Sequence, residues 1–267
     1  MNRIEEKFKQ LGKEGKKAFI AFVTAGYPDL STTLRLVKEF EKKGVDLVEL
    51  GVPFSDPLAD GPAIQEASQF SLKKGVNLLK ILELVKNIRR AGVSIPVCLM
   101  TYYNPVFRFG EKRFVDDALK NGVDGVIIPD LPPEEAKEFI RYADKKNLLN
   151  INFIAPTSSD NRIRQISKSA RGFIYYVSLT GVTGSRSSLS SDLKDNLSKI
   201  KKLIRKPVCV GFGISNAQQV AQVCKISDGV IVGSAIIEKI KKHIGDADLA
   251  EKVARFAQKL KCTKEMI

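Results

Sequence analysis

Short runs of β-branched and apolar residues recur along the chain, separated by longer segments whose apolar positions return at helical spacing beneath charged faces. This alternation is typical of a parallel sheet wrapped by helices. Eight runs predict strands at Ala18–Val23, Leu47–Gly51, Val97–Tyr102, Gly125–Pro129, Ile151–Ala155, Phe173–Ser178, Val208–Gly211 and Gly229–Gly233. Eight segments between or after them predict helices at Ser31–Lys43, Asn77–Ala91, Glu111–Asn121, Pro133–Lys146, Asn161–Ala170, Leu193–Ile204, Asn216–Cys224 and Ser234–Ile244. Because no strand is followed at once by a GxGxxG helix start, the pattern favours a closed (β/α)8 TIM barrel over a doubly wound open sheet.

Two further segments exceed a minimal barrel. Met1–Glu14 has the pattern of an extra amphipathic N-terminal helix that could close the bottom of the barrel, and Leu249–Lys261 that of a terminal helix. Asp29 or Ser31 can cap the first barrel helix. We therefore expect residues 1–267 to form a single barrel domain.

Charge and composition narrow the function. The chain has 44 basic and 30 acidic residues, a net charge of +14 that would attract a phosphorylated metabolite or an acidic partner. Basic residues are interleaved with acidic ones, as in Lys38–Lys43, which indicates solvated helix faces and argues against a nucleic-acid surface. No apolar run approaches the roughly 20 residues that span a membrane, and no signal core opens the chain, so we expect a cytoplasmic protein.

Neither the cysteines nor the histidine indicates a metal site. The four cysteines form no CxxC or Cys/His cluster, and Cys98 and Cys209 lie in apolar runs that predict buried thiols. His243, the only histidine, lies in a basic stretch without neighbours at ligand spacing, so we expect it at the surface. The chemistry is therefore expected to use neither a metal nor histidine.

Two carboxylates stand where this fold places chemistry. Glu49 lies in the apolar strand Leu47–Gly51, where burial would favour its neutral form and make it a proton donor, although a structural carboxylate paired with a lysine is the alternative. A proline-rich loop follows, longer than an ordinary βα connection, and it could bring Asp60 opposite Glu49. On spacing alone, Asp60 could equally cap the helix after Pro62.

Glycine-rich loops after the last two strands predict a phosphate site. Gly211–Ser215 follows the seventh strand and Gly233–Ala235 opens a helix after the eighth, so that backbone amides and a helix N-terminus meet where many barrels bind phosphate. Glycines that serve only as tight turns are the alternative. The glycine- and serine-rich stretch 180–191 after the sixth strand predicts a mobile lid. Aromatic residues at strand ends could line a flat pocket: Phe22, Tyr102, Tyr175 and Phe212.

The run Val48–Pro62, VELGVPFSDPLADGP, resembles the signature of the tryptophan synthase α chain, and the similarity extends in order over essentially the whole chain. Further matching segments are Thr24–Pro28, Tyr102–Pro105, Pro129–Pro132, Ala155–Thr157, Tyr175–Ser178, Thr180–Gly184 and Gly211–Ser215. The resemblance implies a lyase that cleaves indole-3-glycerol phosphate to indole and glyceraldehyde 3-phosphate.

The resemblance also implies roles for individual residues. Glu49 matches the general acid/base, and Asp60 the carboxylate that accepts the indole N–H. Tyr175 matches a tyrosine beside this pair, and Thr183 the threonine that holds Asp60 when the lid closes. The residues that match the phosphate site are Gly184, Gly213, Gly233 and Ser234, and those that match the indole pocket are Phe22, Met100, Tyr102 and Phe212.

A partner is implied as well, a β subunit that carries pyridoxal phosphate in an α2β2 heterotetramer, whereas the α chain needs no cofactor. The β subunit would contact the α chain on the loop around Pro53, Asp56 and Pro57 and on Asn104. Two other functions remain open: a catalytically idle barrel that only activates a β subunit, and another phosphate-binding barrel enzyme. Asn150 and Asn152 depart from the apolar fifth strand usual in the family and leave its packing in doubt.

Overall fold

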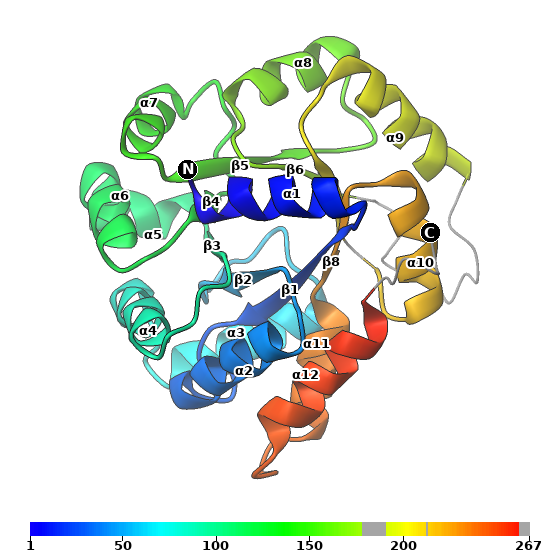
Figure 1. Ribbon diagram of the computed structural model, residues 1–267. Coiled ribbons are helices and arrows are strands. Elements are labelled where there is room, and N and C mark those ends of the chain that lie inside the picture. The colour runs from blue at the N-terminus through cyan, green and yellow to red at the C-terminus, as the bar shows by residue number, and fades with distance from the viewer. Residues whose placement is uncertain (178–190, 212, 262–267) are drawn as a thin grey trace.

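The computed structural model describes residues 1–177, 191–211 and 213–261 (Figure 1). Eight parallel strands close into a barrel in which each strand pairs with the next and β1 also pairs with β8. The strands are β1 (Ala18–Thr24), β2 (Leu47–Gly51), β3 (Val97–Met100), β4 (Gly125–Ile127), β5 (Leu149–Ile154), β6 (Ile174–Val177), β7 (Val208–Gly211) and β8 (Gly229–Val232). The predicted (β/α)8 barrel is confirmed.

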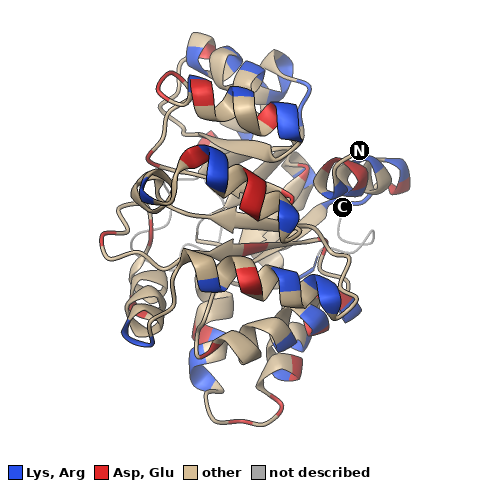
Figure 2. Ribbon diagram, turned by 90° about the vertical axis from the view of Figure 1, so that its left-hand side faces the viewer, with Lys and Arg blue, Asp and Glu red and all other residues tan. Residues whose placement is uncertain are grey.

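Helices surround the barrel and alternate with its strands. They are α1 (Arg3–Glu14), α2 (Leu30–Lys42), α3 (Pro62–Lys73), α4 (Leu78–Arg90), α5 (Tyr103–Phe109), α6 (Glu111–Lys120), α7 (Lys137–Lys146), α8 (Asp160–Ser169), α9 (Ser191–Leu203), α10 (Ala217–Ile226), α11 (Ser234–Lys242) and α12 (Leu249–Leu260). Figure 2 shows basic and acidic residues mixed along the helix ribbons. Within the described ranges, no helix is both long and apolar enough to cross a membrane.

Several boundaries differ from the prediction. The third strand ends at Met100 and not at Tyr102, because the chain turns directly into α5, an unpredicted helix whose N-cap is Tyr102. The fourth predicted helix does not begin at Pro133: residues 132–136 form turns, and α7 begins at Lys137. At α2, Asp29 is the cap, and the Ser31 hydroxyl donates to its carboxylate.

The N-terminal helix α1 closes the bottom of the barrel, as expected (Figure 1). Its Ile4 is fully buried, and its side chain occupies the space where a Cβ on Gly125 or Gly172 would lie. Phe8 packs on Phe173 with ring centroids 5.4 Å apart. The apolar face of α1 therefore seals the barrel at the N-terminal ends of the strands.

Three aspartates repeat one contact around this bottom rim. Asp46, Asp124 and Asp228 directly precede β2, β4 and β8. Each carboxylate accepts the backbone N–H at or beside the start of the preceding strand, over 2.9, 2.8 and 2.9 Å to Phe19, Val97 and Val208. Each also pairs with basic side chains, namely Lys261, Arg3 and Arg89, and Lys17 and Lys201. The rim is thus fixed by buried or half-buried carboxylates that satisfy strand-end amides.

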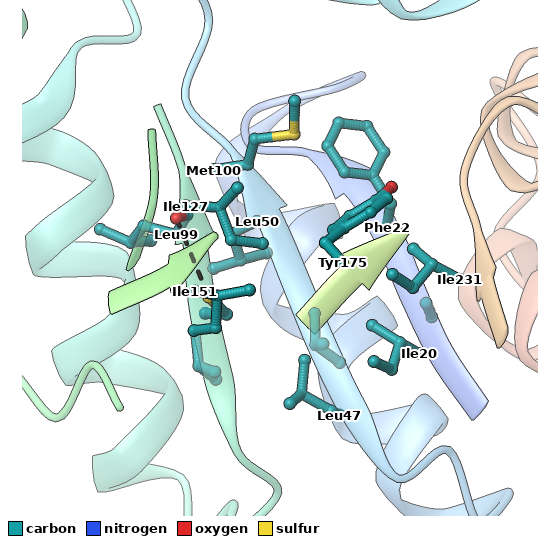
Figure 3. Packing of buried hydrophobic residues seen from close by; sticks show 14 of the residues in the cluster. Ile20, Phe22, Leu47, Leu50, Leu99, Met100, Ile127, Ile151, Tyr175 and Ile231 are labelled. Carbon is teal, nitrogen blue, oxygen red and sulfur yellow. Dashed lines mark hydrogen bonds between the residues drawn. The ribbon is translucent and has the colours of Figure 1, made fainter. Parts of the chain in front are cut away.

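The two amides of β5 have partners on the outer face of the barrel. Asn150 donates to Asn152 over 3.0 Å, and Asn152 donates to the Ser169 hydroxyl at the end of α8 over 3.4 Å. Both asparagines are buried. The barrel interior at β5 stays apolar: Figure 3 shows Ile151 in the packed interior, and Phe153, two residues on, shares its face of the strand. The doubt about the packing of this strand is thereby resolved.

We expect Asp124→Asn to lower the free energy of unfolding by about 3 kcal/mol, because it leaves the half-buried Arg89 guanidinium without its carboxylate at 2.7 Å. Urea denaturation at neutral pH measures the change. Glu138→Gln is the matched control, since it breaks the exposed pair with Arg141 and should cost less than about 1 kcal/mol. Equal losses in both variants would contradict this account of the rim.

Candidate active site

Glu49 lies inside the barrel on β2, where Leu47, Glu49 and Gly51 share the inward face. It is 0% exposed, and neither carboxyl oxygen has a hydrogen-bond partner among the described residues. The neighbouring position on β3 is Cys98, a buried free thiol as predicted. No lysine pairs with Glu49 in the described part of the chain, so the alternative of a structural ion pair finds no support.

Asp60 stands at the end of the loop 52–61, which leads from β2 to α3 over the mouth of the barrel. The Tyr102 hydroxyl donates to Asp60 Oδ2 over 3.2 Å and accepts the Ala59 backbone N–H over 2.9 Å. The Tyr102 ring stacks on Phe54 at a centroid distance of 5.1 Å. Tyr102 belongs to the next βα unit and contacts the loop both near its start and at its end.

Asp60 does not cap the helix that follows it. The N-cap of α3 is Gly61, which makes no side-chain cap bond, and Pro62 occupies the first turn. The backbone carbonyl of Asp60 accepts from Gln65, but its carboxylate faces Tyr102. The capping alternative is therefore wrong, and the side chain is left for the mouth of the barrel.

A narrow pocket opens at this mouth. Its lining includes Asp60 and three of the predicted pocket residues, Phe22, Met100 and Tyr102. The remaining lining residues are Thr24, Gly51, Val52, Ile64 and Ser68. Phe22 and Met100 lie at the same end of the packed interior in Figure 3. A pocket with flat aromatic walls and one carboxylate suits an aromatic ring that carries a polar N–H.

Glycines on the inward face make room for two aromatic side chains. A Cβ on Gly51 would lie 2.6 Å from the tip of the Phe22 ring, and one on Gly233 would lie 3.3 Å from the same ring. A Cβ on Gly211 would lie 2.5 Å from the Tyr175 hydroxyl. Tyr175 is buried on β6 and packs 4.7 Å from Phe153. Because these glycines lack a Cβ, the rings of Phe22 and Tyr175 can pack directly against the backbone.

The two carboxyl groups ionise at different pH values. Burial raises the pKa of Glu49 to about 8, with a further contribution from the negative charge of Asp60. Burial also raises the pKa of Asp60, to about 6, while the hydrogen bond from Tyr102 opposes the increase. At neutral pH the site thus holds one neutral acid and one anion, as is common for paired acid and base groups.

The predicted phosphate residues that the structure describes lie in neighbouring loops. Gly233 is the N-cap of α11 without a side-chain cap, and Ser234 is its first residue. Gly213 follows β7 at a positive φ of 71°, and the pairing of Cys209 with Gly229 sets β7 beside β8. Because α11 begins directly after β8, its N-terminus lies at the C-terminal ends of the strands, where helix amides can bind an anion.

Other predicted residues are elsewhere. Thr183, Gly184 and Phe212 fall outside the described residues, as does most of the expected lid. His243 is half-buried at the C-cap of α11, with its Nδ1 2.8 Å from Asp246. It therefore lies apart from the pocket.

Sequence reasoning missed four residues at this site: Thr24, Phe54, Ile64 and Ser68. Thr24 could have been found, since it continues the inward alternation of Ile20 and Phe22 on β1. Ile64 and Ser68 reach the pocket from α3, whose orientation no local pattern reveals.

Comparison with known proteins decides the family. The model of the tryptophan synthase alpha chain family matches residues 8–266. The chain belongs to the tryptophan synthase alpha chain family.

Its relatives match over nearly their full length. The tryptophan synthase alpha chains of Geotalea daltonii and Caldanaerobacter subterraneus are 49% and 45% identical to it, and each alignment covers 98% of this chain and at least 98% of the relative. A crystal structure of tryptophan synthase subunit alpha from Legionella pneumophila has a TM-score of 0.91 and 36% identity over 97% of both chains. The tryptophan synthase a2b2 complex from Pyrococcus furiosus matches with a TM-score of 0.85 and 37% identity, covering 91% of this chain and 97% of that one.

Membership of the tryptophan synthase alpha chain family confirms the family resemblance inferred from the signature. It makes the chain a lyase of tryptophan biosynthesis that cleaves indole-3-glycerol phosphate. The reading as a different phosphate-binding barrel enzyme is therefore excluded.

We expect stability to fall as pH rises from about 4.5 to about 8. The folded chain keeps the Glu49 proton in this window while the unfolded chain, with a pKa of 4.5, releases it. The slope for one such group is about 1.4 kcal/mol per pH unit. Glu49→Gln should remove the contribution of this group. The free energy of unfolding of the variant, measured in urea, should therefore rise relative to that of the wild type between pH 5 and pH 8. Parallel curves for the two proteins would contradict the buried, neutral Glu49.

Proposed function

We propose that Glu49 and Asp60 are the acid–base pair with which this chain cleaves indole-3-glycerol phosphate to indole and glyceraldehyde 3-phosphate. The observation that carries the proposal is the difference between the two groups. One carboxyl is fully buried with a raised pKa of about 8, and the other faces the pocket with a pKa of about 6. Near pH 7 the site therefore holds a carboxylate anion in the pocket lining and a proton donor on β2, two residues before the lining residue Gly51.

The reaction follows from these two states. Neutral Glu49 donates its proton to the ring carbon that bears the side chain, and positive charge develops on the ring nitrogen. The Asp60 carboxylate accepts the N–H and stabilises this charge. Glu49, now an anion, takes the proton of the neighbouring side-chain hydroxyl. The carbon–carbon bond then breaks, its electrons return to the ring to give indole, and the hydroxyl carbon becomes the aldehyde.

The remaining residues bind and orient the substrate in this proposal. Phe22, Met100 and Tyr102 hold the ring, and Tyr175 packs beside the carboxylate pair. Amides at Gly213, Gly233 and Ser234 bind the phosphate at the start of α11. Roles for Thr183, Gly184 and Phe212 rest on the family resemblance alone. We also propose that the whole chain is one domain and acts in the cytoplasm.

Two variants test the pair. Glu49→Gln cannot donate or accept the proton and should lower kcat by about 100-fold to 10,000-fold. Asp60→Asn keeps the shape but loses the charge, and should lower kcat by about 100-fold to 1,000-fold. Indole release under steady state measures both, with circular dichroism as a folding control. Wild-type kcat in either variant would exclude that residue, and no indole from the folded wild type with an active β subunit would remove the lyase assignment.

The pH profile provides an independent test. Activity should fall below about pH 6, where Asp60 gains a proton, and above about pH 8, where Glu49 loses its own. Tyr102→Phe removes the hydrogen bond that lowers the pKa of Asp60, so the acidic limb should move to higher pH and the basic limb should stay. An acidic limb that does not move would show that Asp60 does not set it.

A β-subunit partner is suggested by the similarity to the a2b2 complex of Pyrococcus furiosus. We propose that the partner carries pyridoxal phosphate in an α2β2 assembly and binds at the mouth, around Pro53, Asp56, Pro57 and Asn104. Two large apolar side chains lie exposed in these same connections: Leu58 is 91% exposed and Phe107 64% exposed. Large exposed apolar side chains are typical of a protein contact when they gather on one face.

Phe107→Ser should leave the activity of the isolated chain unchanged and reduce its stimulation by a β subunit about tenfold, because an anchor at the contact is lost. Indole release with increasing β subunit measures this. Ile244→Ser is the matched control, since Ile244 is also exposed but follows α11, toward the opposite end of the barrel. The same loss in both variants would contradict a contact at the mouth.

A further inference from the structure

Thr24 is the last residue of β1 and lies on its inward face, above Ile20 and Phe22. It is 1% exposed, and its hydroxyl has no hydrogen-bond partner among the described residues. It also lines the pocket that contains Asp60 and Tyr102. The Thr24 hydroxyl therefore lines the proposed active site and makes no hydrogen bond to any described residue.

An unpartnered hydroxyl is unfavourable in so buried a place, since valine has the same shape and needs no partner. The backbone around Thr24 needs no help from the hydroxyl: the Ala25 N–H donates to the Gly51 carbonyl, and the Thr24 carbonyl accepts the Tyr27 N–H. The hydroxyl thus has no structural task in the described part of the ligand-free chain. With the described residues excluded, a group of the loaded pocket is the candidate partner.

Asp60 is the acceptor that this pocket offers. Tyr102 occupies its Oδ2, and an ionised carboxylate has further acceptor positions for which water competes while the pocket is open. A substrate ring would displace that water. The titratable groups near Asp60 in the described chain are Glu49 on β2, Tyr102 at the start of α5 and Tyr175 on β6, and no basic side chain is among them. A hydroxyl donor is therefore the available replacement.

We propose that Thr24 is a positioning residue for Asp60: when the substrate ring fills the pocket, the Thr24 hydroxyl donates a hydrogen bond to the Asp60 carboxylate and aims it at the ring N–H. This inference rests on the proposed function of Asp60. It differs from the contact made by Tyr102, which exists already in the ligand-free chain. Thr24 acts only in the complex with substrate.

The two contacts have different kinetic signatures. The profile of kcat against pH reports groups in the enzyme–substrate complex, and that of kcat/KM reports groups in the free enzyme. Thr24→Val removes a donor to the carboxylate only in the complex, so the pKa of Asp60 should rise there alone. Its acidic limb should move to higher pH in kcat and stay in kcat/KM. Tyr102→Phe should move the acidic limb in both profiles, kcat and kcat/KM.

The experiment measures indole release from pH 5 to pH 9 for wild type, Thr24→Val, Thr24→Ala and Thr24→Ser. Loss of one charge-assisted hydrogen bond should lower kcat about tenfold in the valine and alanine variants, with KM changed less than about twofold. The serine variant retains the hydroxyl and should regain most of kcat. Ser71→Ala is the control: it removes another buried hydroxyl without a described partner, on α3 outside the pocket lining, and should change neither limb.

The proposal would be overturned if Thr24→Val and Thr24→Ala both kept the wild-type kcat and the acidic limb of their kcat profiles did not move. A loss of the same size in Thr24→Ser or Ser71→Ala would also overturn it, since the effect would then be one of packing. A rise in KM alone would assign Thr24 to ground-state binding and exclude the contact with Asp60. Failure of the proposed role of Asp60 is distinguishable, because Asp60→Asn would then keep the wild-type kcat.

Discussion

The burial of Glu49, without a hydrogen-bond partner in the part of the chain that the structure describes, is the constraint on which the rest of the site depends. A carboxyl group in such surroundings keeps its proton at neutral pH only while water is excluded from both ends of the barrel. At the bottom, α1 and its buried Ile4 provide the seal. At the top, the Phe22 ring lies over Gly51, directly beyond Glu49 on the same face of β2. Packing at both ends of the barrel, from Ile4 at the bottom and Phe22 at the top, therefore keeps the Glu49 carboxyl group neutral.

Asp60 is governed by the opposite condition. It belongs to a loop and not to a strand, it lines the open pocket, and it accepts a hydrogen bond from Tyr102. Its pKa accordingly rises less than that of Glu49. Glu49 and Asp60 have nearly the same chemistry but reach different protonation states because of their positions. Glu49 is fully buried in a strand, and Asp60 lies in a loop at the mouth of the barrel.

Most of the barrel could be predicted because strand and helix periodicity are local properties. The inward row Leu47, Glu49 and Gly51 followed from strand alternation, and the amphipathic pattern of Met1–Glu14 indicated a helix that could close the bottom. The end of β3 could not be predicted, because Tyr102 and Tyr103 have strand propensity and only the tertiary fold turns them into the start of α5. That turn is what brings the Tyr102 hydroxyl to Asp60. The role of Asp60 needed the three-dimensional contact, since capping and catalysis leave the same spacing in sequence.

The bottom rim joins residues that are very distant in sequence. Lys261 donates to the Gly44 carbonyl and lies 3.0 Å from Asp46, contacts that span 217 and 215 positions. β1 pairs with β8 over a similar separation. Because loop closure must precede the gain from such contacts, the first βα unit remains open on one side until the last strand and helix have been synthesised and docked. The order of translation therefore leaves the edge of β1 exposed for most of the time the ribosome needs to make the chain.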